Sequence, residues 1–179
     1  MLNKFLPILF ACVWVPAEAV LAQQTSDTGS QANTAVTTEQ HKDWAISCQN
    51  QNDVLENCRM FQRLVLEESN RVVLQMLVLP SRDKTDSQAV LVLPLGLYLP
   101  AGVKLVIDNG APLDLVYDRC FSQGCTARAP LSSALLNSMK RGNVAQVVIR
   151  EAAERDLILK VSLSGFTAAH KALMTKVAG

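Results

Sequence analysis

The sequence has little of the residue types with which enzymes usually do chemistry. Its 179 residues include two histidines and two tyrosines, and aromatic residues make up only 5%. It contains no Gly-x-Ser-x-Gly nucleophile elbow, no His-Glu-x-x-His zinc helix and no glycine-rich phosphate loop. The common hydrolase, metalloprotease and nucleotide-binding classes therefore have no support here, and we expect neither enzyme activity nor a cofactor.

Charge of one sign and long apolar runs are missing as well. The 17 basic and 16 acidic residues give a formal net charge of +1, so the composition does not favour nucleic acid or an anionic membrane as a partner. The apolar run at residues 5–15 is broken by Pro7 and followed by Pro16 and Glu18, well short of the roughly 20 residues that span a bilayer. We expect no transmembrane segment in the mature chain.

Residues 1–22 instead have the features of a removable export signal. Lys4 supplies the positive start, the apolar run follows, and residues 20–22 have the small or modest side chains of a cleavage site. We expect cleavage near Ala22 and a mature protein that is periplasmic, associated with the outer membrane, or secreted. An uncleaved anchor and lipidation at Cys12 are the alternatives, although Phe10 is bulky for a lipidation motif.

Four of the five cysteines remain after this cleavage, and they stand in two close pairs, Cys48 with Cys58 and Cys120 with Cys125. Disulfides persist outside the reducing cytosol, so an even number of cysteines in an exported chain favours structural bonds. Bonding within each close pair is the most economical of the three connectivities, and the other two stay open. A zinc site would need cysteines at tighter spacing than Cys48 and Cys58, so we expect no bound metal. Redox exchange favours a Cys-x-x-Cys pair, whereas four residues separate Cys120 from Cys125, so we expect structural bonds.

The mature chain divides into a polar segment and one domain. Residues 23–40 are mainly Gln, Thr, Ser, Ala, Asn and Asp, which cannot bury enough apolar surface to offset the entropy of ordering them. We expect a flexible polar tether there. Residues 41–179 are of the usual size of a single domain and suffice for one core.

Short runs of Val, Leu and Ile, separated by turn-forming residues, predict an all-β domain. About eight short strands with sparse helix favour an antiparallel β-sandwich. The expected strands are 44–47, 59–66, 72–79, 89–93, 103–107, 113–117, 144–150 and 157–163.

Two segments, 131–140 and 166–177, have apolar residues at helical spacing. For the first, Ser132 or Ser133 can cap the start and Gly142 can end the helix. For the second, we expect a buried docking face, with a partner-binding terminal helix as the alternative.

The residues that could carry catalysis are scattered. His41 and His170 stand apart from any Ser or Cys nucleophile in the sequence, and we interpret both as solvated polar residues. Asp108, Asp114 and Asp118 lie near strand ends, where turn chemistry commonly places Asp. We therefore predict no catalytic, cofactor-binding or metal-binding residue.

Several motifs occur in an order that is more specific than any one of them. They are Trp44-x-x-x-Cys48, Cys58, the proline and glycine stretch at 93–103 running into Ile107-Asp108, Cys120 with Gly124-Cys125, and Leu163-Ser164-Gly165-Phe166 before Ala169. Together they resemble the invasion-associated locus B family. The resemblance extends from Asp43 to about Leu173, nearly the whole expected domain.

This resemblance implies an exported protein of Gram-negative bacteria, mostly alphaproteobacteria, with an immunoglobulin-like β-sandwich core and no established enzyme activity. The family is named for a virulence role, invasion of host cells and notably erythrocytes in one pathogenic lineage, but it also has members in bacteria that do not invade. Only Cys48, Cys58, Cys120 and Cys125 carry over as site residues, as disulfide partners.

Our leading functional hypothesis is a non-enzymatic envelope protein that binds a protein of the envelope or of a host surface through a sheet edge or its loops. The alternative is a periplasmic domain that binds a small ligand or an envelope polymer in a cleft. Residues such as Tyr98, Tyr117 and Phe121 would line that cleft.

Overall fold

The computed structural model describes residues 35–51, 54–83, 85–153 and 155–178. The predicted export signal and residues 23–34 of the predicted tether lie outside the described residues. The described part contains eleven strands, two α-helices and one 3-10 helix. In chain order these are β1 Ala35–His41, β2 Trp44–Gln51, β3 Val54–Leu66, β4 Arg71–Pro80, β5 Ser87–Leu93, η1 Leu99–Ala101, β6 Val103–Ile107, β7 Leu113–Leu115, β8 Tyr117–Phe121, β9 Gly124–Pro130, α1 Ser133–Arg141, β10 Val144–Arg150, β11 Asp156–Ser162 and α2 Phe166–Ala178.

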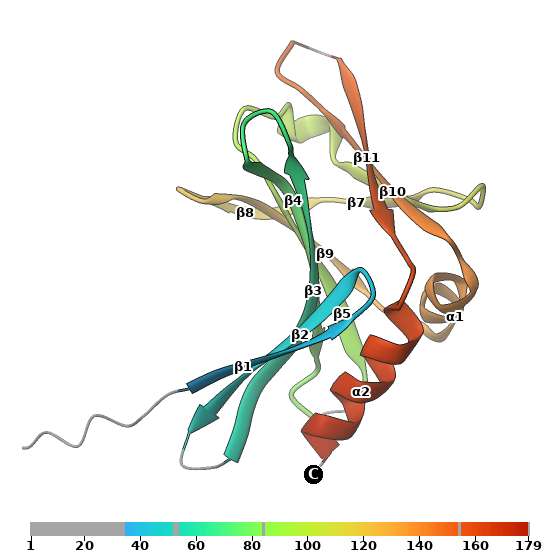
Figure 1. The fold of residues 1–179 in the computed structure, drawn as a ribbon. Helices are drawn as coiled ribbons and strands as arrows, with labels where there is room; N and C mark the ends of the chain where they lie inside the picture. Colours follow the sequence, from blue (N-terminus) through green and yellow to red (C-terminus); the bar gives the residue numbers. More distant parts are fainter. Residues whose placement is uncertain (1–34, 52–53, 84, 154, 179) are drawn as a thin grey trace, which may run out of the picture. The chain divides into compact units, whose positions relative to one another are not determined.

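These strands form two antiparallel sheets (Figure 1). The larger sheet has the order β1-β2-β3-β4-β5-β9-β8, and the smaller has the order β11-β10-β6-β7. Strands β1 to β5 follow one another as a meander, a more sequential path than the Greek key of immunoglobulin domains. The prediction of an all-β, antiparallel sandwich with two short helices and two disulfides is confirmed.

One hydrophobic core joins both sheets and both helices. Alternate residues of the larger sheet, among them Met60, Met76 and Leu91, have no exposed surface, as the two-residue period of a strand requires. The ring of Phe166 at the start of α2 meets that of Trp44 edge to face, with centroids 5.2 Å apart. Burying side chains of this size stabilises the fold by about 1.5–3 kcal/mol each.

A polar clamp holds the end of the smaller sheet against the larger one. Gln62 of β3 donates to the carbonyl of Ser162 and accepts from its backbone N–H, at 3.1 and 2.9 Å. The indole Nε1 of Trp44 donates to the same carbonyl at 2.9 Å. The amide of Gln62 therefore satisfies backbone groups of Ser162 at the end of β11, the edge strand of the smaller sheet, and this contact joins the two sheets.

Two strands were not predicted, and the first corrects the tether. Residues 35–40 belong to β1, which pairs with β2 from Ala35 opposite Asn50 to His41 opposite Trp44. The interpretation of 23–40 as a tether was wrong at its end because backbone pairing along an existing edge orders a polar segment that has no core of its own. The second strand, β9, is the centre of the β5-β9-β8 pairing. Its buried positions are small, Ala127 and Ala129.

The predicted strand 113–117 is two strands in different sheets. The chain leaves the smaller sheet at Leu115, crosses at Val116, and enters the larger sheet at Tyr117. Val116 is 81% exposed at this crossing. Both predicted helices are confirmed, with Ser132 capping α1 by accepting from the N–H of Leu135 at 3.3 Å.

Candidate functional site

The four cysteines form the two bonds that spacing favoured, Cys48–Cys58 and Cys120–Cys125. The first lies in the core, where both residues are at most 4% exposed, and it crosses a register shift between β2 and β3. The second joins residues directly opposite each other in the β8–β9 hairpin. Because the sulfurs are oxidised and held within sheets, we assign both bonds a structural role.

The structure corrects the interpretation of His170 as solvated. Its side chain is 6% exposed, stacks on Phe166, and lies with Nε2 3.0 Å from the hydroxyl of Ser87, which is 8% exposed. Desolvation, aided by the positive charge of Lys140, lowers the pKa of His170 below its ordinary value of 6.5. This pair, 83 residues apart in sequence, fastens α2 to the start of β5.

The three aspartates are not brought together. Asp114 pairs with Lys104 at 3.3 Å on the surface of the smaller sheet. Asp118 accepts from Arg128 at 2.9 Å and from Arg119 at 3.2 Å. Desolvation raises the pKa of Asp118, but the two arginines lower it further and hold that pKa below its ordinary value. Each carboxylate therefore has its own local partners.

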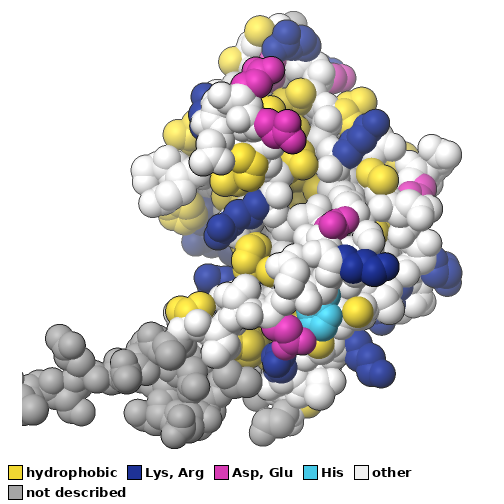
Figure 2. All heavy atoms as spheres, in the orientation of Figure 1, with side chains coloured by type: hydrophobic (Ala, Val, Ile, Leu, Met, Phe, Trp, Pro, Cys, Tyr) yellow, Lys and Arg dark blue, Asp and Glu magenta, His cyan; other side chains and the backbone are white. Residues whose placement is uncertain are grey.

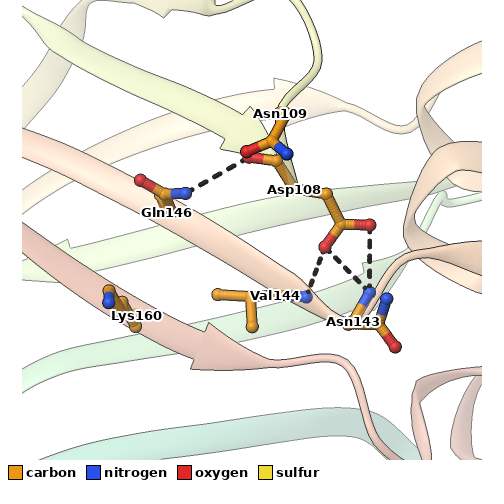
Figure 3. Close-up of a pocket in the computed structure, with 6 residues that line it drawn as sticks. All are labelled: Asp108, Asn109, Asn143, Val144, Gln146 and Lys160. Atoms are coloured by element: carbon orange, nitrogen blue, oxygen red, sulfur yellow. Dashed lines mark hydrogen bonds between the residues drawn. The ribbon is translucent and has the colours of Figure 1, made fainter.

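Asp108 forms part of a polar pocket of about 490 Å³ at the end of β6 (Figure 3). Its carboxylate accepts from the backbone N–H groups of Asn143 and Val144 at 2.9–3.2 Å, so it is committed to pinning β10 beside β6. Gln146 donates to the carbonyl of Asp108 at 3.2 Å. The groups that remain for a ligand are the side-chain amides of Asn109 and Asn143 and the ammonium of Lys160. These groups suit hydroxyl or carbonyl groups of a ligand.

The aromatic cleft of the alternative hypothesis is not formed. Tyr117 lies opposite Ala127 on the core face, whereas Phe121 lies opposite Gly124 and is 53% exposed. The register shift between Tyr117 and Arg119 places these two rings on opposite faces of the sheet. Tyr98 is 42% exposed at the start of η1. The periodicity of the sequence could not reveal that Tyr117 and Phe121 lie on opposite faces. A single extra residue in a strand reverses which of the following side chains face the core.

The side of the larger sheet that faces away from the smaller sheet, called the outer face below, carries a feature that the sequence reading missed. Figure 1 shows α2 and the smaller sheet together on the opposite side. An apolar row crosses the outer face through four strands, and it ends at a cation. In register order the row consists of Ala45 of β2, Phe61 of β3, Leu77 of β4 and Val90 of β5. The cation is Arg128 of β9, which lies opposite Val90.

Arginines flank this row, and two of them have no acidic partner in the described part of the chain. Arg59 and Arg63 of β3 are exposed, and the guanidinium of Arg63 lies 5.0 Å from the ring centre of Phe61. Across the whole face that Figure 2 presents, cationic, acidic and hydrophobic side chains are mixed.

Other kinds of site find no support in the described residues. No group of three or more His, Cys, Asp or Glu side chains there could hold a metal ion. None of the helices within those residues is long and apolar enough to cross a membrane.

Two antiparallel sheets around one core, two disulfides and a docked terminal helix define a disulfide-bonded β-sandwich domain. A family model described as Invasion associated locus B (IalB) protein matches residues 44–174. The chain belongs to this family, as the resemblance of its motifs indicated.

Relatives and a solved structure agree with this assignment. The chain is similar to two proteins named Invasion protein B homolog, from Brucella abortus strain 2308 and from B. abortus biovar 1 strain 9-941. Each is 30% identical over 132 residues, which is 73% of this chain and 75% of the relative. The crystal structure of invasion associated protein b from Bartonella henselae superposes with a TM-score of 0.71 at 26% identity, over 80% of this chain and 99% of that one.

Proposed function

We propose that this protein is a non-enzymatic protein of the bacterial envelope that binds another protein through the outer face of its larger sheet. The observation that carries the proposal is the apolar row from Ala45 to Val90, in which Phe61 and Leu77 are half-buried and the two end residues are buried. It is flanked by the exposed Arg59 and Arg63, which have no acidic partner among the described residues. Arginines around an apolar centre are typical of protein interfaces. The partner is a protein of the envelope or of a host surface.

Export supports the same proposal. Two disulfides suit an oxidising compartment, and residues 1–22 have the features of an export signal. Fractionation of the source bacterium followed by intact-mass measurement tests this. We expect the protein in the periplasm, the outer-membrane fraction or the medium, with a mass that corresponds to cleavage after Ala22 and is four hydrogens below that of the reduced chain. A cytoplasmic, uncleaved chain would contradict export.

The non-enzymatic part rests on what the candidate groups are doing. Ser87 and His170 are buried against each other, and Asp108 and Asp118 are bonded to backbone and to arginines respectively. Crosslinking in intact cells followed by mass spectrometry tests the binding role. Repeated recovery of the same protein partner supports it, and repeated recovery of none contradicts it.

A second candidate, binding of a small ligand or envelope polymer, is favoured by the polar pocket beside Asp108. The amides of Asn109 and Asn143 with the ammonium of Lys160 could hydrogen-bond sugar hydroxyls. A thermal shift screen with envelope glycans tests it, since a ligand that binds only the folded state raises the melting temperature. Lys160→Ala should remove any such shift if this pocket is responsible.

A further inference from the structure

A slot of about 270 Å³ lies on the outer face, next to the apolar row. It is built from β3, β4, the end of β5 and the turn between β8 and β9. Apolar groups from β4 and β5 and polar groups from β3, β4 and the turn both line it. The side chains that matter for its chemistry are Arg63, Val72, Gln75, Val92, Pro94 and Gln123.

Two register features bring these side chains together. Arg63, Gln75 and Val92 are consecutive partners across β3, β4 and β5, so they stand side by side on one face. A register shift between Leu64 and Val65 then pairs Val65 with Val72. This shift turns Val72, which is 49% exposed, into the slot.

The polar groups of the slot have hydrogen-bonding capacity to spare. The guanidinium of Arg63 is supported by the ring of Phe61 at 5.0 Å and has no carboxylate partner in the described chain. The side-chain amides of Gln75 and Gln123 have no hydrogen-bond partner there either. A guanidinium fork held over an aromatic ring is pre-organised for a planar anion, because less side-chain freedom is lost when it binds.

The apolar wall selects among anions. Val72, Val92 and Pro94 offer no hydrogen bonds, so an apolar group must accompany the anion to fill the slot. Net charge argues against a membrane surface as the source, since the chain carries only +1 overall and recruitment to anionic lipid takes clusters of several cations.

We infer that this slot binds a carboxylate of an acidic, apolar segment of a partner protein, with Arg63 as the bidentate donor and Gln75 and Gln123 as supporting donors. The inference rests on the proposed function and deepens it. An Asp or Glu side chain beside an apolar residue, or a C-terminal carboxylate after one, meets the requirement. The charge-assisted hydrogen bonds supply specificity, and the apolar wall supplies contact area.

Selection from a random peptide library displayed on phage, with the purified oxidised mature chain as bait, tests the inference. We expect enriched peptides to carry Asp or Glu next to apolar residues. In fluorescence anisotropy with an enriched peptide, Arg63→Gln should weaken binding about tenfold or more, the loss expected for a hydrogen bond to a charged group. Arg82→Gln, a change to an exposed arginine in the turn after β4, should leave binding unchanged.

Replacing the acidic residue of the peptide by its amide closes a double-mutant cycle. The effect of Arg63→Gln should disappear with the amide peptide, because the two groups act on each other. Gln123→Glu, in an exposed turn, provides a second variant that repels the carboxylate without touching β3. Circular dichroism and thermal melting confirm that each variant is folded.

Other outcomes overturn the inference. Enriched peptides without acidic residues, or equal binding by Arg63→Gln, would show that the slot does not recognise carboxylates. The proposed function would still stand in that case if crosslinking recovers an envelope protein. Failure to enrich any peptide, with Arg63-dependent binding to phosphatidylglycerol vesicles instead, would assign the slot to lipid.

Discussion

At the scale of single residues, Gly165 is fixed by a close approach between two distant segments. It has φ +90, and a Cβ placed there would overlap the carbonyl oxygen of His41. Asp43 also donates its backbone N–H to Ser164 at 3.4 Å. The glycine of the Leu163–Phe166 motif is therefore required where the β1–β2 turn meets the start of α2.

We predict that Gly165→Ala destabilises the domain more than Gly96→Ala does. Both positions have positive φ, +90 and +85, but Gly96 has open space around its Cβ position. The backbone cost of about 1–3 kcal/mol is shared, so the difference between the variants isolates the overlap with His41. Urea unfolding measures it, and equal losses would contradict this explanation.

His170 provides a residue-scale prediction about pH. Its pKa is lowered in the folded state by burial and by Lys140, so the unfolded chain binds the proton more readily. Stability should therefore fall as pH decreases from about 7 towards 5, through the ordinary histidine pKa of about 6.5. In His170→Gln this part of the pH dependence should be absent. Urea unfolding at several pH values in that range measures the stability of the wild-type protein and of His170→Gln. Parallel dependence of stability on pH in the two proteins would contradict this explanation.

At the scale of elements, the β8–β9 hairpin depends on its disulfide and on Gly124. Gly124 has φ +138, and a Cβ there would overlap the carbonyl of Leu93 on β5. Cys125 is 3% exposed beside it, whereas Cys120 is exposed. The two sulfurs of this bond therefore differ in their access to solvent.

This difference predicts the outcome of removing either cysteine. Cys125→Ser should leave Cys120 free to react rapidly with a thiol label, and Cys120→Ser should leave Cys125 reacting slowly. Cys48 and Cys58 should stay protected in both variants. Peptide mapping by mass spectrometry identifies the labelled residue, and a label on Cys48 or Cys58 would show crossed pairing. Each variant should lose about 2–3 kcal/mol of stability on the chain-entropy model.

Element prediction from sequence worked where large apolar residues mark a strand. Strands β6 and β10 have the predicted bounds, since both are rich in Val, Leu and Ile, bury alternate residues and lie between clear turn residues. Strand β9 was missed because its buried positions include Ala127 and Ala129, and alanine does not mark a strand as Val, Leu and Ile do. Strand β1 was missed because its order comes from pairing with β2, which no local pattern encodes.

At the scale of the whole molecule, sequence reasoning predicted the fold class and the disulfides but not the candidate binding surface. The outer face depends on which side chains share a side of the sheet, and register shifts near Val65 and near Arg119 reverse that order. The buried pairing of Ser87 with His170 likewise joins segments that only the folded chain brings together. The motif set nevertheless identified the family, because order and spacing survive where individual positions change.

Photo-crosslinking from defined positions tests the central claim, that the outer face of the larger sheet binds a protein partner. A photoreactive residue replaces Leu77 on the outer face in one strain and Ile158, which is 52% exposed on the smaller sheet, in another. Export and folding are checked in both by thiol protection. We predict that the Leu77 position crosslinks the same envelope or host-surface protein reproducibly and the Ile158 position does not. No protein crosslink from Leu77, or the same partners from both positions, would contradict the account.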